Sequence, residues 1–143
     1  MSKNIFIAFI TLFLVSCGNK AGVQQAEKQA EEQIVSAGDS STVTIYYFHG
    51  KQRCKTCIAV GELTEETIKE TYAGNAKVRF IEIDTSEKQY KSLVNKYEVS
   101  WNALIIVKGE NFVDITEQAF ANAISNPAAL SALIKKEVNQ RIS

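Results

Sequence analysis

A run of β-branched and aromatic residues at positions 42–48, Thr-Val-Thr-Ile-Tyr-Tyr-Phe, is the feature that most constrains how this chain can fold. Seven such residues in succession are typical of a buried β-strand. Residues 49–53 end the run, and from about Cys54 the apolar residues recur with helical spacing as far as Gly74, a residue type that commonly follows a helix end. The chain therefore places a strand directly before a helix, with Cys54 and Cys57 at the junction.

The residues after this helix alternate between strand and helix patterns. A second strand is predicted at 77–83, and Asp84 and Glu87 then have the spacing of a capping box at a helix start. A third strand is predicted at 103–108. A tight turn follows it, and a short strand at 112–114 returns the chain, most simply as a β-hairpin.

Two helices are predicted to close the domain. The first is a short stretch over 117–124, and the second begins with Asn126 as its N-cap and Pro127 as its first residue. Strand–helix–strand connections imply parallel pairing, and a hairpin adds an antiparallel edge. We therefore predict an α/β fold, with a mixed sheet of about four strands flanked by helices on both faces, in one domain over 42–143.

The N-terminal residues have the features of an export signal. Lys3 precedes an apolar run at 5–15, which suits the core of a signal peptide and is too short to cross a bilayer. The sequence Leu-Val-Ser-Cys, ending at Cys17, follows the pattern of a bacterial lipoprotein signal, in which the cysteine is diacylated. We predict a lipoprotein signal peptide over 1–16 and a lipidated Cys17 that begins a tether over 17–41. An ordinary signal peptide or an uncleaved short anchor remains the alternative.

These N-terminal predictions place the domain at a membrane. Two acyl chains give stable anchoring where one gives only marginal binding. The protein is then expected to be a lipoprotein facing the periplasm or the cell exterior. The balance of 16 Lys and Arg against 16 Asp and Glu provides no basic field, so we expect no nucleic-acid partner.

The cysteine pair is the candidate catalytic site. At a helix N-terminus the free N–H groups and the helix dipole favour a thiolate, so we expect the pKa of the Cys54 thiol to lie below its ordinary value of about 8.5. Lys51, Arg53 and Lys55 add positive charge nearby. Cys57 is three residues further on, inside the first turn, where it can resolve a mixed disulfide formed at Cys54.

Of three other uses of the pair, two remain open. A closed zinc site needs four ligands, and besides this pair the mature chain offers only His49, so no metal site of that kind is predicted. Two thiols could instead bind Cu(I), which would make the protein a soft-metal module. A purely structural disulfide is the third alternative, although so short a loop restricts the unfolded chain little.

Strand, loop, CxxC and helix make this segment resemble the thioredoxin family. The resemblance extends over about 42–142, through the strand at 78–84 that ends in Asp and through Lys96-Tyr97-Glu98-Val99, which is similar to the family's entry to its next strand. It implies a thioredoxin-like fold and thiol–disulfide oxidoreductase activity without a cofactor. By the same resemblance, Cys54 is the attacking thiol and Cys57 the resolving one.

The sequence departs from the family at several places around the pair. Arg53 stands where the family usually has Trp, and Lys55-Thr56 replaces Gly-Pro between the cysteines. Ala103 occupies the position of the family's cis-proline. Since a cis bond before a non-proline residue costs about 3–4 kcal/mol, we expect a trans bond there.

The remaining candidate residues have two interpretations each. His49 either tunes Cys54 or is only a hydrogen-bonded loop residue, and the cations around the pair either tune it or form a solvated rim. Trp101, which precedes Asn102 and Ala103 in the loop beside the active surface, either forms a docking patch or caps the core. The expected partners are protein thiols or disulfides and a membrane redox partner. The sequence does not determine the direction of transfer, the client or the membrane.

Overall fold

The computed structural model describes residues 40–143. The predicted signal peptide, Cys17 and nearly all of the tether lie outside the described residues. The elements are, in chain order, β1 (Val43–His49), α2 (Lys55–Thr71), β2 (Val78–Asp84), the 3-10 helix η2 (Lys88–Tyr90), α3 (Lys91–Lys96), β3 (Ala103–Lys108), β4 (Asn111–Asp114), α4 (Thr116–Asn122) and α5 (Pro127–Ile142). Of the helices in the described part of the chain, none has the length and apolar character needed to span a bilayer.

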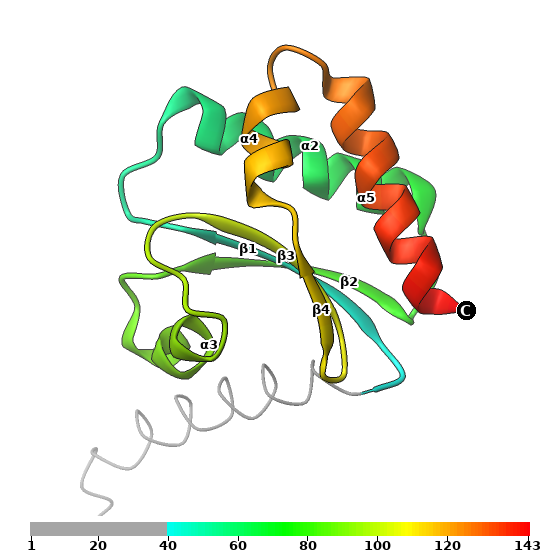
Figure 1. Ribbon diagram of the computed structural model, residues 1–143, viewed down its shortest axis with the longest axis horizontal. Helices are drawn as coiled ribbons and strands as arrows, with labels where there is room; N and C mark the ends of the chain where they lie inside the picture. Colours follow the sequence, from blue (N-terminus) through cyan, green and yellow to red (C-terminus); the bar gives the residue numbers. More distant parts are fainter. Residues whose placement is uncertain (1–39) are drawn as a thin grey trace, which may run out of the picture.

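The four strands form one mixed sheet in the order β2-β1-β3-β4 (Figure 1). β1 pairs in parallel with β2 and antiparallel with β3, and β4 pairs antiparallel with β3. Because α2 connects the two parallel strands and a tight turn connects β3 to β4, the sheet combines a crossover with a hairpin. The predicted α/β class is confirmed, and the strand order gives a thioredoxin-like fold.

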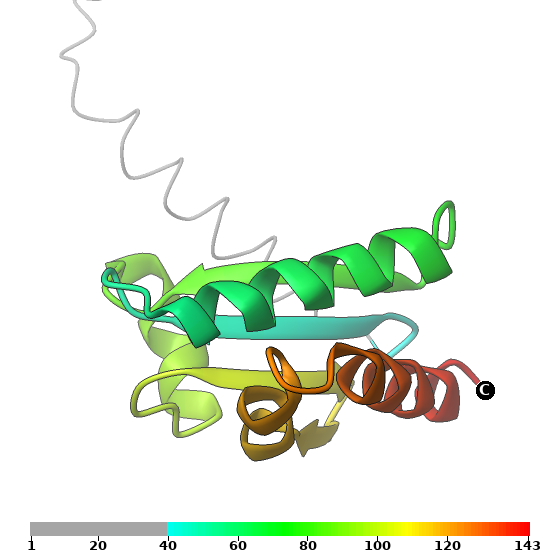
Figure 2. The ribbon, with the colours of Figure 1, turned by 90° about the horizontal axis from the view of Figure 1, so that it is seen from above.

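Helices cover both faces of this sheet, and β1 contributes to both cores. Alternate side chains of β1, among them Val43, Ile45 and Tyr47, pack in the core under α2, α4 and α5. The intervening Tyr46 and Phe48 pack in the second core, on the side of α3. Figure 2 shows α2 and α5 running alongside each other over the same face. Burial on both faces explains why the sequence of β1 is apolar without alternation.

The boundaries of α2 and α5 agree with the predicted helix starts and ends. The carbonyl of Asn126 begins α5, and its side chain accepts a hydrogen bond from the Ala129 N–H, with Pro127 in the first turn. Cys54 is the N-cap of α2, which ends at Thr71, before Gly74 adopts a positive φ of 75°. The site cysteine is therefore itself the residue that begins the long helix.

The predicted capping box at Asp84 and Glu87 is wrong. β2 extends through Asp84, whose carboxylate accepts hydrogen bonds from the Ser86 N–H at 2.8 Å and the Ser86 hydroxyl at 2.6 Å. Those two bonds lower the pKa of Asp84. Helical structure begins only at Lys88, and Glu87 makes no side-chain capping bond. A local turn around the Asp side chain competes successfully with the helix start.

Candidate functional site

Strand register brings the candidate site together at one end of the sheet. Phe48, next to the last residue of β1, pairs with Ala103, the first residue of β3. The loop that leads to α2 leaves β1 at this end, and the loop that leads to β3 arrives there (left in Figure 1). The CxxC pair and the 101–103 segment are therefore neighbours in space although more than forty residues separate them in the sequence.

The two cysteines form a disulfide across the first turn of α2, with their Cα atoms 5.0 Å apart. Cys54 is exposed, and its Sγ accepts a hydrogen bond from the Cys57 N–H at 3.0 Å. Cys57 is only 4% exposed. A thiolate at Cys54 would thus be open to a partner and stabilised by the free N–H groups of the helix start, whereas Cys57 is shielded.

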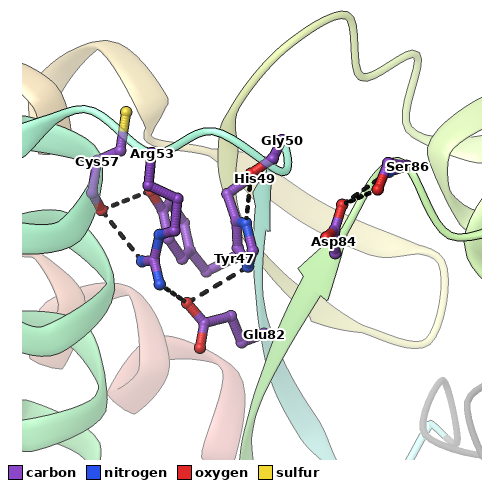
Figure 3. A network of polar contacts seen from close by, with 8 residues as sticks. All are labelled: Tyr47, His49, Gly50, Arg53, Cys57, Glu82, Asp84 and Ser86. Atoms are coloured by element: carbon purple, nitrogen blue, oxygen red, sulfur yellow. Dashed lines mark hydrogen bonds and ion pairs between the residues drawn. The ribbon is translucent and has the colours of Figure 1, made fainter.

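Arg53 occupies the position before the first cysteine and ties the loop to two elements. Its Nη1 lies 2.8 Å from Oε1 of Glu82 on β2, and its Nη2 donates to the carbonyl oxygen of Cys57 at 3.4 Å (Figure 3). The guanidinium also lies over the ring of Tyr47, 5.6 Å from its centroid. Glu82 thus pairs with the Arg53 charge that was expected to tune Cys54. The Arg53 side chain therefore links the loop before α2 and the first turn of α2 to β2.

His49 shares the same carboxylate. Its Nε2 lies 3.5 Å from Oε1 of Glu82, and its Nδ1 lies 2.9 Å from the carbonyl oxygen of Gly50. A carbonyl oxygen can only accept, so Nδ1 carries the hydrogen in this arrangement. The contact between Nε2 and Glu82 is consequently attractive when the imidazole is protonated. His49 is a hydrogen-bonded residue of the strand end, and it belongs to the network beside the cysteines.

Tyr47, on the strand under α2, is hydrogen-bonded to the backbone of the cysteine pair. Its hydroxyl donates a 2.6 Å hydrogen bond to the carbonyl oxygen of Cys57. Burial raises the pKa of the Tyr47 phenol, and the nearby Arg53 guanidinium opposes this rise in part. The phenol therefore stays protonated, and remains a donor, through the neutral range. Gly61, one helical turn after Cys57, leaves room for this packing, because a Cβ there would lie 2.6 Å from Arg53 Nη2 and 2.9 Å from Tyr47 Cε1.

The 101–103 segment presents three different surroundings. Trp101 is 82% exposed, so it does not cap the core. Asn102 is half-buried, and its Nδ2 lies 3.8 Å from the Sγ of Cys57. Ala103 is 4% exposed, and the peptide bond before it is trans, as expected from its not being proline. The segment therefore offers one exposed ring and one amide that contacts a sulfur of the disulfide.

The remaining cations and the apolar surface near the pair are solvated. Lys51 and Lys55 are exposed, as the solvated-rim interpretation requires. Ile58, directly after Cys57, is 40% exposed. Within residues 40–143, no group of three or more His, Cys, Asp or Glu side chains is arranged to hold a metal ion.

Three residues of the site are not apparent as site residues from the sequence: Tyr47, Gly61 and Glu82. Tyr47 and Glu82 pair directly across β1 and β2, so their side chains share the face on which α2 lies. Glu82 follows Val78 and Phe80 at alternate positions of β2, and both of these pack in the core under α2. That alternation was the available signal, because it places a carboxylate on the helix-covered face near the strand end.

No protein-family model and no curated protein matches this chain. Among solved structures, the chain is similar to one described as the structure of a malarial protein, with 26% identity and a TM-score of 0.47 over 66% of this chain and 96% of that one. It is also similar to the crystal structure of Trxlp from Edwardsiella tarda EIB202, with 17% identity and a TM-score of 0.44 over 77% of this chain and 91% of that one. Strand order and pairing define the fold independently of these likenesses. The chain is an α/β protein of thioredoxin-like fold with a CxxC pair joined as a disulfide.

Proposed function

We propose that this protein is a membrane-anchored, extracytoplasmic thiol–disulfide oxidoreductase that works through Cys54 and Cys57. One observation carries the proposal: an exposed cysteine at a helix N-cap is bonded to a buried cysteine three residues later. This asymmetry suits one cysteine to meet a partner and the other to complete the exchange.

The proposed exchange conserves electrons at each step. In the reducing direction, the Cys54 thiolate attacks a disulfide of the partner, a mixed disulfide forms, and one partner thiolate leaves. The Cys57 thiolate then attacks Cys54 Sγ, forms the intramolecular disulfide and releases the second partner thiolate. Two electrons have passed from the cysteine pair to the partner. The oxidising direction is the same sequence reversed.

The surroundings of Cys54 support protein clients and not only small thiols. Trp101 and Ile58 are exposed apolar side chains on the two segments next to the pair. An aromatic ring with an exposed face can pack against a bound polypeptide at little conformational cost. We propose that they contact the client around its reacting cysteine. A membrane redox partner would restore the oxidation state of the pair after each cycle.

The export and anchoring part of the proposal rests on the sequence around Cys17. It can be tested by supplying a labelled fatty acid to bacterial cells that express the full chain. Incorporation into the protein, and its loss in Cys17→Ser, is the expected result. Equal label in both proteins, or none in either, would contradict lipidation of Cys17.

The enzymatic part is tested by insulin-disulfide reduction with dithiothreitol as electron donor. The wild-type protein should accelerate the reaction, and Cys54→Ser should not. The reduction potential of the pair, measured against glutathione, then gives the direction favoured in the exported compartment. Equal rates for wild type and Cys54→Ser, together with no oxidation of a reduced client by the disulfide form, would overturn the proposal.

A further inference from the structure

Asn102 is held beside the buried cysteine by the sheet. It directly precedes β3, whose first residue, Ala103, is paired with Phe48 of β1. Ala103 is buried, and the pairing fixes the backbone at this point. The Asn102 side chain is therefore carried by a strand end, which gives it a more constrained position than a free loop would.

The contact joins an amide donor to a sulfur that water barely reaches. Nδ2 of Asn102 lies 3.8 Å from Cys57 Sγ, within the range of hydrogen bonds to sulfur, and Cys57 is 4% exposed. The Cys57 backbone N–H donates instead to Cys54 Sγ. Each sulfur of the disulfide thus has its own donor, one from the helix start and the other from Asn102.

We propose that Asn102 is a catalytic residue whose side-chain N–H stabilises the negative charge that collects on Cys57 Sγ when the Cys54–Cys57 bond opens. This inference rests on the proposed thiol–disulfide function and assigns a further group to the same site. A donor already in place needs no reorganisation during the reaction, and in a shielded site it is worth more than in water. The Asn102 N–H would act on the Cys57 thiolate as the donors of an oxyanion hole act on a developing oxyanion.

The proposed effect belongs to one bond-breaking step. An incoming thiolate attacks Cys54 Sγ and forms the new S–S bond, while the Cys54–Cys57 bond breaks and its electron pair passes to Cys57 Sγ. In the opposite direction, the Cys57 thiolate attacks Cys54 Sγ and the partner sulfur leaves with the electron pair. The Cys57 thiolate occurs in both directions, so the same donor lowers the barrier to opening and keeps the resolving thiol ionised.

Two substitutions separate hydrogen bonding from packing. Asn102→Leu keeps the approximate size and shape but removes the N–H, and Asn102→Asp keeps the shape but directs a carboxylate at the sulfur. Asn95→Leu, at an exposed position of α3, is the matched control. The full-length oxidised proteins are mixed with excess glutathione, and the first opening of the disulfide is followed by acid quenching, alkylation and mass analysis.

The opening rate should fall about threefold in Asn102→Leu, because only part of the charge has developed on the leaving sulfur in the transition state. Asn102→Asp should be slower still, by about tenfold, because its carboxylate repels that charge. Asn95→Leu should match the wild type. Wild-type rates in both Asn102 variants would overturn the proposal.

The reduction potential as a function of pH distinguishes this role from a general effect on structure. A donor to the thiolate acts only where Cys57 ionises, so the wild-type and Asn102→Leu potentials should converge at low pH. At high pH, the variant should be lower by about 30 mV, which corresponds to a tenfold change in the equilibrium constant. A difference that is constant across pH would mean that Asn102 only shapes the loop, and would overturn the proposal.

These measurements use glutathione and need no physiological client. If insulin reduction and oxidation of a reduced client both fail while the variants still differ as described, the function proposal is wrong and the role of Asn102 in opening the disulfide stands. If insulin reduction succeeds while the variants behave as wild type, the function proposal stands and the proposed role of Asn102 is wrong.

Discussion

The two cysteines of the Cys54–Cys57 disulfide lie in opposite surroundings although they are bonded to each other. Cys54 is exposed, is the N-cap of α2 and is followed in the chain by the exposed Lys55. Cys57 is buried, and its backbone carbonyl accepts hydrogen bonds from Tyr47 and Arg53. One side of the bond faces solvent and the other faces a packed network.

This difference indicates how two cysteines only three residues apart can react in a fixed order. The exposed sulfur is the one a partner can reach, so the mixed disulfide should form there. The buried sulfur is held close by its helix and by the network, so it meets the mixed disulfide without diffusing. Access to Cys54 and rigid support of Cys57 are separate requirements, and different residues meet them.

The largest expected effect comes from removing either sulfur. Cys54→Ser should abolish turnover and form no mixed disulfide with a client. Cys57→Ser should also stop turnover but accumulate a mixed disulfide at Cys54, because the attack succeeds and the resolving thiol is missing. Non-reducing gel electrophoresis with a disulfide-containing client checks this. If Cys54→Ser accumulated the adduct instead, the order assigned to the two sulfurs would be reversed.

A methyl group at position 61 should disturb the packed side of the site. In Gly61→Ala, the new Cβ would lie 2.6 Å from Arg53 Nη2 and 2.9 Å from Tyr47 Cε1. Overpacking costs about 1–3 kcal/mol, and the better helix propensity of Ala returns up to about 1 kcal/mol. We expect a net loss of about 1–2 kcal/mol in the free energy of unfolding, measured by denaturant titration of the oxidised protein.

Gly50→Ala is the matched control for that substitution, since a Cβ at Gly50 would meet nothing within 4 Å. It should leave stability nearly unchanged. In an Arg53→Ala background, Gly61→Ala should cost less, because one of the two crowding groups has gone. Equal costs in both backgrounds would show that Arg53 is not part of the packed support.

Alkaline pH should lower the free energy of unfolding by ionising Tyr47, whose hydroxyl donates a hydrogen bond to the Cys57 carbonyl. Burial raises the pKa of its phenol above the ordinary value of 10.0, so its contribution to stability is fully present below pH 10 and is lost as pH rises through the folded-state pKa. Tyr47→Phe should cost about 1 kcal/mol of stability below pH 10, the typical worth of a hydrogen bond, and less above it.

Denaturant titrations at several pH values from 8 upward check this expectation. A remaining alkaline decline is expected in the variant, because burial raises the pKa of Tyr46 to about 12 and its phenol is buried in the other core. Wild-type and Tyr47→Phe curves that run parallel across the whole range would mean that the Tyr47 phenol does not contribute through ionisation.

The smallest effect is expected from the exposed Trp101, beside the cysteine pair, on the KM for a protein client. Trp101→Ala should raise the KM for a protein client about three- to fivefold, because an exposed ring contributes modestly to binding, and should leave stability and the reaction with glutathione unchanged. Phe112→Ala is the control, since Phe112 is also exposed but lies on β4, opposite Val107 near the far end of β3. An equal rise in KM for both variants would remove Trp101 from the docking surface.

The sequence allowed much of this fold to be predicted because its signals are local. The apolar run of β1, the helical spacing after Cys54 and the cap at Asn126 each depend on residues close together in the chain. The failed capping box at Asp84 and Glu87 depended on the same kind of signal. There the spacing was correct, but a turn closed by Ser86 used the same carboxylate.

By itself, the sequence determined the strand–helix junction that places Cys54 at a helix start, together with the identity and spacing of the two cysteines. Only the tertiary structure decided which groups support them. Glu82 meets Arg53 because β2 is paired in parallel with β1, and Asn102 meets Cys57 because β3 begins opposite the end of β1. Contacts of this kind depend on strand order and register across long stretches of sequence, which local residue patterns do not specify.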